Sequence, residues 1–307
     1  MSRILVTPRS LSRDGHPALD ALSQAGYELV MPAPGAIPAE DTLISALPGC
    51  VGWLAGVEPV SARALAAADR LRVISRNGSG VDNLPLSQLE ARGIAVTRAD
   101  GANANGVAEL ALTLLLAGLR HVVPIHEGMR QGGWPRQIGR EICDCTIGIV
   151  GLGAIGRITA RICLALGARV RAHDPFAPGD AVEDPRCERV TLDELVEEVD
   201  AITLHAPLPP DGRPLLTATR IARLRPGTVL VNTARAGLVD SEALLHALDE
   251  GRVAGYLTDV YNVEPPEPSA LMGHPQVTLT SHIGGYTVSS VERATRAAVG
   301  NLLRELR

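Results

Sequence analysis

Short apolar runs alternate with segments of helical periodicity along the whole chain. In the first third, these runs lie at Ile4–Thr7, Glu28–Met31, Val51–Ala55, Arg72–Ser75 and Ile94–Thr97. A second series lies at Thr146–Val150, Arg169–His173, Ala201–His205, Val229–Asn232, Ala254–Thr258 and Val277–Thr280. The runs are rich in valine, isoleucine and leucine with little polar alternation, which is typical of strands covered by helices on both faces of a sheet. The pattern predicts an α/β protein built on parallel sheets.

Helical periodicity fills the gaps between these runs, for example at Pro17–Gln24 and Ser61–Ala67. The segment Asn103–Arg120 lies between the two series, and its apolar spacing predicts a long helix that connects two α/β units. The last segment, Ser289–Arg307, predicts an amphipathic helix. Its expected apolar side carries Val291, Ala294, Ala297, Ala298, Leu302 and Leu303.

A glycine-rich turn follows the run at Thr146–Val150 and opens a predicted helix at Arg157–Leu166. Its sequence is Gly151-Leu152-Gly153-Ala154-Ile155-Gly156. The first glycine of this pattern permits a tight turn, the second lets a pyrophosphate approach the backbone, and the third lets helix and strand pack closely. The helix N-terminus would offer its N–H groups to the phosphates. Alone, the pattern also fits a plain turn between a strand and a helix.

Asp174 supplies the context that the glycines need. It ends the next predicted strand, at about the twenty-residue spacing where an acidic residue contacts the adenosine ribose. On its own, an aspartate before Pro175 would be a turn former. With the glycine turn it predicts a dinucleotide site, and because a carboxylate repels a 2′-phosphate, NAD is favoured over NADP. About half of the predicted strands precede this site, so we expect a separate first domain and an active-site cleft between the two domains.

Charged residues follow three predicted strands of the second series. Arg235 follows one strand, Glu264 the next and His282 the last. Open α/β sheets bind ligands at these strand ends. Hydride transfer to a 2-oxo acid needs a cation for the carboxylate, a proton donor for the carbonyl oxygen and a group that tunes the donor. Arginine suits the first role, and a histidine beside a carboxylate suits the others. Each residue taken singly also fits a surface charge, a loop residue or a structural histidine.

The composition narrows the chemistry. The 307 residues are 46% hydrophobic and 21% charged, and a net charge of −5 with both signs scattered favours neither nucleic acid nor an anionic membrane as a partner. Every basic residue is arginine, which excludes Schiff-base chemistry and a lysine general base. The most apolar stretch, Val107–Leu119, contains Glu109 and is shorter than the roughly 20 residues of a membrane span. Five cysteines without regular spacing predict reduced thiols, a cytoplasmic location and no metal site.

Taken together, these motifs closely resemble the D-isomer-specific 2-hydroxyacid dehydrogenase family, over nearly the whole chain. The matching segments are Ser75–Asn83, Gly101–Asn103, Val107–Glu109, Gly151–Gly156, His205–Leu208, Asn232–Asp240, Asp259–Pro265 and His282–Gly285. The resemblance implies two parallel-sheet domains of Rossmann-like or flavodoxin-like type. Residues 1–98 with 288–307 would form the substrate domain, and residues 99–287 the NAD-binding Rossmann domain. The C-terminal helix would cross back to complete the first domain.

The resemblance also implies residue roles and a reaction. The chain would transfer a hydride between NAD and C2 of a D-2-hydroxy acid or its 2-oxo acid. Arg235 would bind the substrate, His282 would be the acid/base and Glu264 its partner, while the backbone around Ser79 and Gly80 would receive the substrate carboxylate. The implied cofactor contacts, which include Asp259 at the nicotinamide carboxamide, are Gly151, Gly153, Ala154, Ile155, Gly156, Asp174, Ala206, Thr233, Ala234, Asp259 and Gly284. Family structures further imply a homodimer through the cofactor domains, around Asn103–Arg120.

Departures from the family pattern bear on the cofactor and the substrate. Ala154 stands where many members carry an arginine that touches the pyrophosphate. Glu264 disfavours formate as substrate, since formate dehydrogenases have glutamine there, and Ser79 disfavours phosphite, whose dehydrogenases carry a lysine. Ala55–Glu58 lacks the arginine that biosynthetic phosphoglycerate dehydrogenases use for phosphate. A small unphosphorylated acid, or one held by Arg76 or another arginine, is at least as well supported as a phosphorylated or phosphonate acid.

Two other classes of protein share parts of this pattern. An NAD-sensing interaction protein of the corepressor type has this fold and keeps the three charged residues, but it needs an exposed peptide-binding cleft on the first domain, and the sequence shows no identifiable one. NAD enzymes of the adenosylhomocysteine hydrolase or alanine dehydrogenase type use lysine in the site, and this sequence has no lysine.

Overall fold

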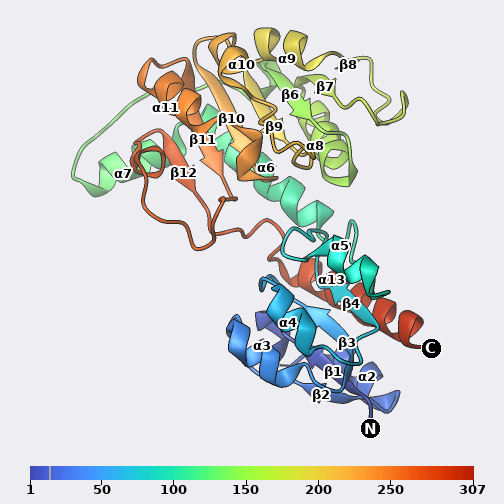
Figure 1. Ribbon diagram of the computed structural model, residues 1–307. Helices are drawn as coiled ribbons and strands as arrows, with labels where there is room; N and C mark the ends of the chain where they lie inside the picture. Colours follow the sequence, from blue (N-terminus) through green and yellow to red (C-terminus); the bar gives the residue numbers. More distant parts are fainter. Residues whose placement is uncertain (14) are drawn as a thin grey trace. The chain divides into compact units, whose positions relative to one another are not determined.

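The computed structural model describes residues 1–13 and 15–307, and they form two compact units. The first unit comprises residues 1–103 and 285–307, and the second comprises residues 104–284. Each unit has a parallel sheet with helices on both faces (Figure 1). The predicted α/β class with two parallel sheets is therefore confirmed.

The first unit contains a five-stranded sheet in the order β2-β1-β3-β4-β5, with every neighbouring pair parallel. This order is that of flavodoxin-like folds. The central strand, β3, is buried at all six positions, as expected when helices cover both faces. The strands are β1 (Arg3–Val6), β2 (Glu28–Val30), β3 (Cys50–Ala55), β4 (Val73–Arg76) and β5 (Ala95–Arg98).

Helices cover this sheet on its two faces. On one face, Leu43, Leu65 and Leu89 bring three helices onto Trp53 and Ile74 of the strands. On the other face, the long C-terminal helix contacts the strands β3, β4 and β5. The helices are α1 (Arg9–Ser12), η1 (Pro17–Leu19), α2 (Asp20–Gln24), α3 (Glu40–Ala46), α4 (Ala62–Ala67), α5 (Leu86–Ala91) and α13 (Val288–Leu306).

The second unit contains a seven-stranded sheet in the order β12-β11-β10-β9-β6-β7-β8, again with parallel pairs only. Chain order reverses between β6 and β9, and open α/β sheets bind ligands at the strand ends beside such a reversal. The strands are β6 (Thr146–Val150), β7 (Arg169–His173), β8 (Cys187–Arg189), β9 (Ala201–Leu204), β10 (Thr228–Asn232), β11 (Val253–Thr258) and β12 (Val277–Leu279).

Two apolar clusters, one on each face, hold helices to the second sheet. α6 and α8 pack together on one face, and α9, α10 and α11 cover the other (Figure 1). The helices are α6 (Ala104–Leu119), α7 (Val122–Arg130), η2 (Ile142–Asp144), α8 (Ala154–Ala165), α9 (Leu192–Glu198), α10 (Ala218–Ala222), η3 (Ala236–Leu238), α11 (Ser241–Asp249) and α12 (Ala270–Gly273).

Two details of the predicted elements differ from the structure. Strand β8 was not predicted, because it is a three-residue edge strand with only partial burial. The predicted apolar side of α13 also contains three residues that are only half-buried, Val291, Ala297 and Leu303. The buried residues of this helix are Ser290, Ala294, Thr295, Ala298, Val299, Leu302 and Leu306. Small polar residues replace apolar ones where the helix lies against the sheet, and Ser75 donates a hydrogen bond to the Ala298 carbonyl there at 2.9 Å.

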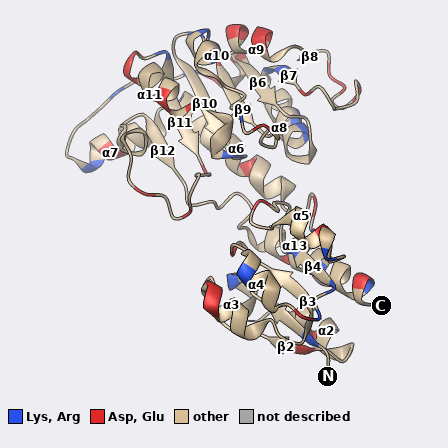
Figure 2. Cartoon of the chain, viewed as in Figure 1, with Lys and Arg blue, Asp and Glu red and all other residues tan. Residues whose placement is uncertain are grey.

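Charged side chains of both signs are scattered over both units (Figure 2). In the described part of the chain, no single helix is long and apolar enough to cross a membrane. The helices α6 and α7 meet that requirement only as a pair, and they are bent by 65° at their junction.

Candidate active site

The predicted glycine loop connects β6 to α8 at the reversal of the second sheet. A Cβ atom on Gly156 would overlap the carbonyl oxygen of Gly151, so a side chain cannot fit there. Gly151 itself has a φ of 95°. Gly153 has open space around its Cβ position and caps α8 with no side-chain hydrogen bond. The loop thus has both the tight packing and the open helix N-terminus that a pyrophosphate needs.

Asp174 lies directly beside this loop. One carboxylate oxygen accepts a hydrogen bond from the Leu152 amide at 2.7 Å, and the other accepts from the Phe176 and Ala177 amides at 2.9 and 3.1 Å. Partial burial raises the pKa of Asp174, but these amides and the charge of Arg189 outweigh burial and lower the pKa overall. A fixed, ionised carboxylate therefore stands at the end of β7.

Two buried polar atoms directly after β9 and β10 lack a hydrogen-bond partner among residues 1–13 and 15–307: His205 Nδ1 and Thr233 Oγ1. His205 follows β9, and its carbonyl oxygen would lie 2.8 Å from a Cβ on Gly151. Burial lowers the pKa of His205 to about 3, so the ring is neutral, and its Nε2 lies 3.0 Å from Thr203 Oγ1. Unmet hydrogen-bonding capacity at these strand ends fits a polar cofactor such as NAD.

His205 was not among the cofactor residues predicted from the sequence, although the neighbouring Ala206 was. Ala206 and Ala234 are both partly exposed, next to His205 and Thr233 respectively. The signal that could have found His205 is its position at the end of an apolar strand, directly before Ala206.

Arg235 stands in the loop that follows β10, and Asn232 shapes that loop. The Asn232 amide is fully buried and donates to the Arg235 carbonyl at 2.9 Å, while its oxygen accepts from the Ala234 amide at 3.1 Å. The partly exposed Arg235 donates from Nη1 to the Ala234 carbonyl at 2.7 Å. The loop therefore presents a guanidinium at the end of the strand.

Glu264 and His282 form the hydrogen-bonded pair that the sequence suggested. The ring N–H at Nδ1 of His282 lies 2.8 Å from each carboxylate oxygen of Glu264. The side chains are 50% and 38% exposed, for His282 and Glu264 respectively, so the pair is open to ligands. A second hydrogen bond to Glu264, from the Tyr261 amide at 3.3 Å, helps to fix the carboxylate.

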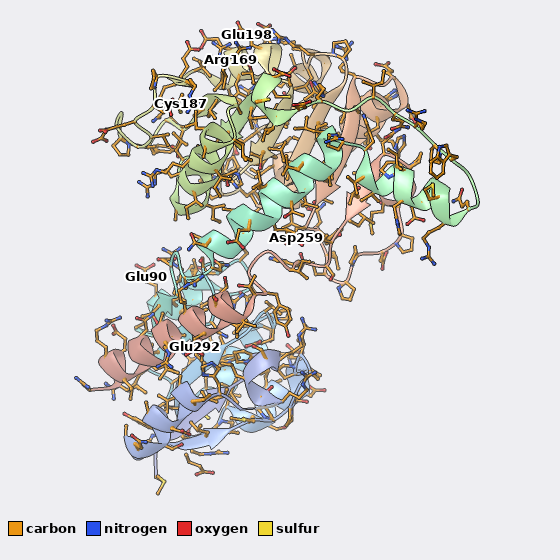
Figure 3. The ribbon with its side chains drawn as sticks, turned by 180° about the vertical axis from the view of Figure 1, so that it is seen from behind. Glu90, Arg169, Cys187, Glu198, Asp259 and Glu292 are labelled. Atoms are coloured by element: carbon orange, nitrogen blue, oxygen red, sulfur yellow. The ribbon has the colours of Figure 1, made fainter. Side chains whose placement is uncertain are left out.

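Asp259 holds the turn on which His282 stands. The residue is 1% exposed and lies at the end of β11 (Figure 3). One oxygen accepts from Thr280 Oγ1 at 2.7 Å and the Ile283 amide at 2.8 Å, and the other accepts from the Gly284 amide at 2.8 Å. His282 has a φ of 55°, a left-handed conformation that is costly for a residue with a side chain. The Asp259 hydrogen bonds on both sides of His282 stabilise that conformation, a role that the sequence did not indicate.

The three charged residues share one edge of the second sheet. β10, β11 and β12 are neighbours, and Arg235, Glu264 and His282 follow their carboxyl ends in that order. Ser79 and Gly80 belong to the first unit, in the loop after β4, where Ser79 Oγ lies 3.4 Å from Asn103 Oδ1.

Comparisons with known proteins show similarity to one enzyme family. Residues 112–284 match the model of the D-isomer specific 2-hydroxyacid dehydrogenase NAD binding domain. Hydroxypyruvate reductase from Thermotoga maritima is 36% identical over 252 residues, which are 80% of this chain and 81% of that protein. D-3-phosphoglycerate dehydrogenase from Mycobacterium tuberculosis (strain ATCC 25618 / H37Rv) is 36% identical over 260 residues, which are 84% of this chain and 49% of that protein. The chain thus spans about half the length of the mycobacterial phosphoglycerate dehydrogenases that it matches.

Among solved structures, the TT0316 protein from Thermus thermophilus superposes with a TM-score of 0.88. It is 34% identical, and the match covers 99% of this chain and 96% of that one. The likeness extends over both units.

Proposed function

Because the chain belongs to the D-isomer specific 2-hydroxyacid dehydrogenase family, we propose that it transfers a hydride between NAD(H) and C2 of a D-2-hydroxy acid or the matching 2-oxo acid. The observation that carries this proposal is the hydrogen-bonded pair of His282 and Glu264, at the same sheet edge as Arg235. That edge holds a cation, a proton donor and a carboxylate that tunes the donor.

Each residue has a part in this chemistry. The Arg235 guanidinium binds the substrate carboxylate and polarises the reacting carbonyl. Glu264 accepts the N–H at Nδ1 of His282, which leaves Nε2 to give a proton to the carbonyl oxygen during reduction and to take it back during oxidation. The nicotinamide ring, when bound, supplies or accepts the hydride.

We assign NAD to the second unit. Gly151, Gly153, Ala154, Ile155 and Gly156 would hold the pyrophosphate at the N-terminus of α8, and Asp174 would accept the ribose hydroxyls. The remaining contacts would come from Ala206, Thr233, Ala234, Asp259 and Gly284. The fixed charge of Asp174 supports NAD over NADP, because it would repel a 2′-phosphate.

In the first unit, we assign the backbone around Ser79 and Gly80 to the substrate carboxylate. Among acids, we favour small unphosphorylated ones. The support is Ala55–Glu58, which contains no arginine and includes a buried glutamate. Phosphorylated and phosphonate acids stay as alternatives.

We further propose a homodimer formed through the second unit. Its support is a set of exposed apolar side chains in and after α7. These are Val122, Met129, Trp134 and Ile138, with exposures of 52%, 44%, 78% and 99%.

The five cysteines of the described chain are free, which supports a reducing compartment such as the cytoplasm.

A panel of 2-oxo acids followed by NADH absorbance tests the reaction. The panel contains plain, phosphorylated and phosphonate acids, each with NADH and with NADPH. We expect reduction of at least one unphosphorylated acid, with NADH preferred. If no acid is reduced while NADH still binds, the NAD-sensing interaction protein of the corepressor type becomes the better account.

A further inference from the structure

Glu58 is a buried acid in the first unit, outside the residues assigned to the reaction. It stands in the loop after β3 and is 1% exposed, which is rare for a glutamate. Thr7 Oγ1 donates to Glu58 Oε1, and the Gly56 amide donates to the same oxygen at 2.9 Å. The Trp53 indole in turn donates to Thr7 Oγ1 at 2.9 Å. The carboxylate thus ties together the ends of β1 and β3.

Arg76 extends this cluster to the end of β4. It is 8% exposed, and its charge acts on the Glu58 carboxyl. Burial raises the pKa of Glu58, while the Thr7 hydroxyl, backbone amides and Arg76 oppose the rise. Arg76 Nη1 donates to the Asn77 carbonyl at 3.2 Å, and a Cβ on Gly78 would lie 3.4 Å from the same nitrogen. The guanidinium therefore lies directly against the backbone that leads to Ser79.

Further hydrogen bonds join the loop after β3 to the loop after β4. The Asn77 amide donates to the Ala55 carbonyl at 2.9 Å. Asn83 Nδ2 donates to the Glu58 carbonyl at 2.7 Å, and the Val60 amide donates to the Asn83 carbonyl at 3.0 Å. A displacement of Glu58 would therefore move both loops.

We propose that Glu58 is a positioning residue for the substrate: its buried carboxylate fixes the chain at Gly56–Glu58, and the hydrogen bonds of this segment and of Ala55 to Asn83 and Asn77 hold the Asn77–Gly80 backbone that receives the substrate carboxylate. This inference rests on the proposed function for its reference to substrate. The Glu58 carboxylate is hydrogen-bonded to the Thr7 hydroxyl and the Gly56 amide, and we assign it no contact with the substrate. Loss of the Glu58 charge weakens the hydrogen bonds that its carboxylate accepts from the Thr7 hydroxyl and the Gly56 amide, and the loop after β3 is then held less firmly. Misplacement of a binding group by about 1 Å can cost up to about 100-fold in rate.

The test compares Glu58→Gln with Thr7→Val, and it uses Thr7→Ser and Glu90→Gln as matched controls. Gln keeps the size and one acceptor oxygen of Glu58 but removes the charge. Val removes the Thr7 hydroxyl, whereas Ser retains it. Glu90 is an exposed residue of α5 in the same unit, and its change leaves the buried cluster intact. NADH affinity by fluorescence titration serves as a further readout, because we assign the cofactor to the second unit.

We expect Glu58→Gln and Thr7→Val to raise KM for the preferred 2-oxo acid about tenfold, with a smaller change in kcat and the same Kd for NADH. Amide hydrogen exchange should become faster at residues 77–80 in both variants. Thr7→Ser and Glu90→Gln should match the unaltered protein. If Glu58 had a purely structural role, both variants would have a lower melting temperature, but KM would not change more than kcat.

Failure of the positioning role and failure of the proposed function give different results in this test. Unchanged hydrogen exchange at residues 77–80 in both Glu58→Gln and Thr7→Val overturns the inference, whether or not any acid is reduced. Faster exchange with an unchanged KM overturns it as well, since the loop would then move without consequence for substrate. Absence of turnover by the unaltered protein counts against the proposed function alone, and exchange at residues 77–80 still decides the positioning role.

Discussion

The two units each contain an acid that is 1% exposed near the end of a strand, but they use it differently. Asp259 in the second unit accepts two backbone amides and a hydroxyl, and the turn that it holds presents the half-exposed side chain of His282. Glu58 in the first unit accepts one amide and one hydroxyl, and it lies under a loop that offers mainly backbone groups.

We interpret this difference as a division of roles, with proton transfer in the second unit and binding of the substrate by backbone groups in the first. The second unit exposes charged side chains at its strand ends, where proton transfer and carboxylate binding need them. The first unit buries Glu58 and Arg76 at its strand ends and offers backbone N–H groups there, which can bind a carboxylate but cannot exchange a proton with it at neutral pH. Variants of His282 and Glu264 in the second unit should therefore act mainly on kcat, and variants of the buried Glu58 cluster in the first unit mainly on KM.

Among the variants that test this difference between the units, His282→Ala should have the largest effect on activity. Loss of the general acid should lower kcat/KM about 1000-fold, while NADH affinity changes little, because the ring is not assigned to the cofactor. Arg235→Ala should have an effect of similar size, with a larger part in KM. Steady-state kinetics and NADH titration measure both. Normal turnover in either variant would remove that residue from the mechanism.

Glu264→Gln should come next, with kcat lowered about 100-fold. The amide can still accept the hydrogen bond from His282 Nδ1, but it no longer stabilises the protonated ring. Steady-state kinetics of 2-oxo acid reduction measure this loss. Thermal stability should hardly change, because an exposed ion pair contributes little. An unchanged kcat would mean that Glu264 does not support proton transfer by His282.

The sequence was sufficient for much of the fold because the chemistry of strands and the glycine turn is local. The bounds of β6 and β7 agree with the predicted runs, since apolar residues fill β6 up to the glycine turn, and buried and polar residues alternate along β7 up to Asp174. The sequence also suggested the Glu264–His282 pair, through its resemblance to the D-isomer-specific 2-hydroxyacid dehydrogenase family. The bracing roles of Asp259, Asn232 and Glu58 could not be predicted, because each depends on hydrogen bonds to backbone groups that only the folded loops bring close.

A moderate effect is expected at Gly153 and provides a test of the cofactor loop. A Cβ at this position meets no atom within 4 Å, and its φ is −67°, so Gly153→Ala should fold normally. If the pyrophosphate lies against this backbone, the methyl group should weaken NADH binding about tenfold, as measured by titration. Gly156→Ala should instead destabilise the second unit, because its Cβ would meet the Gly151 carbonyl. Unchanged NADH affinity in Gly153→Ala would place the cofactor elsewhere.

The smallest effect expected is a pair of opposite pH dependences of stability, one from each unit. The pKa of Asp174 is lowered from its ordinary 3.8, so the stability that its charge contributes is present above that value and is lost as pH falls through the lower, folded pKa. The pKa of Glu58 is raised from its ordinary 4.5, so stability is highest below 4.5 and declines as pH rises through the folded pKa.

Urea midpoints for the unaltered protein, Asp174→Asn and Glu58→Gln across acid and neutral pH would measure both slopes. The advantage of the unaltered protein over Asp174→Asn should shrink as the pH falls below about 4, whereas its stability relative to Glu58→Gln should fall as the pH rises above about 4.5. Each slope is at most about 1.4 kcal/mol per pH unit, because a single proton is involved. Parallel slopes in the two variants would contradict the comparison, since they would mean that burial does not outweigh the hydrogen bonds to Glu58 in the first unit.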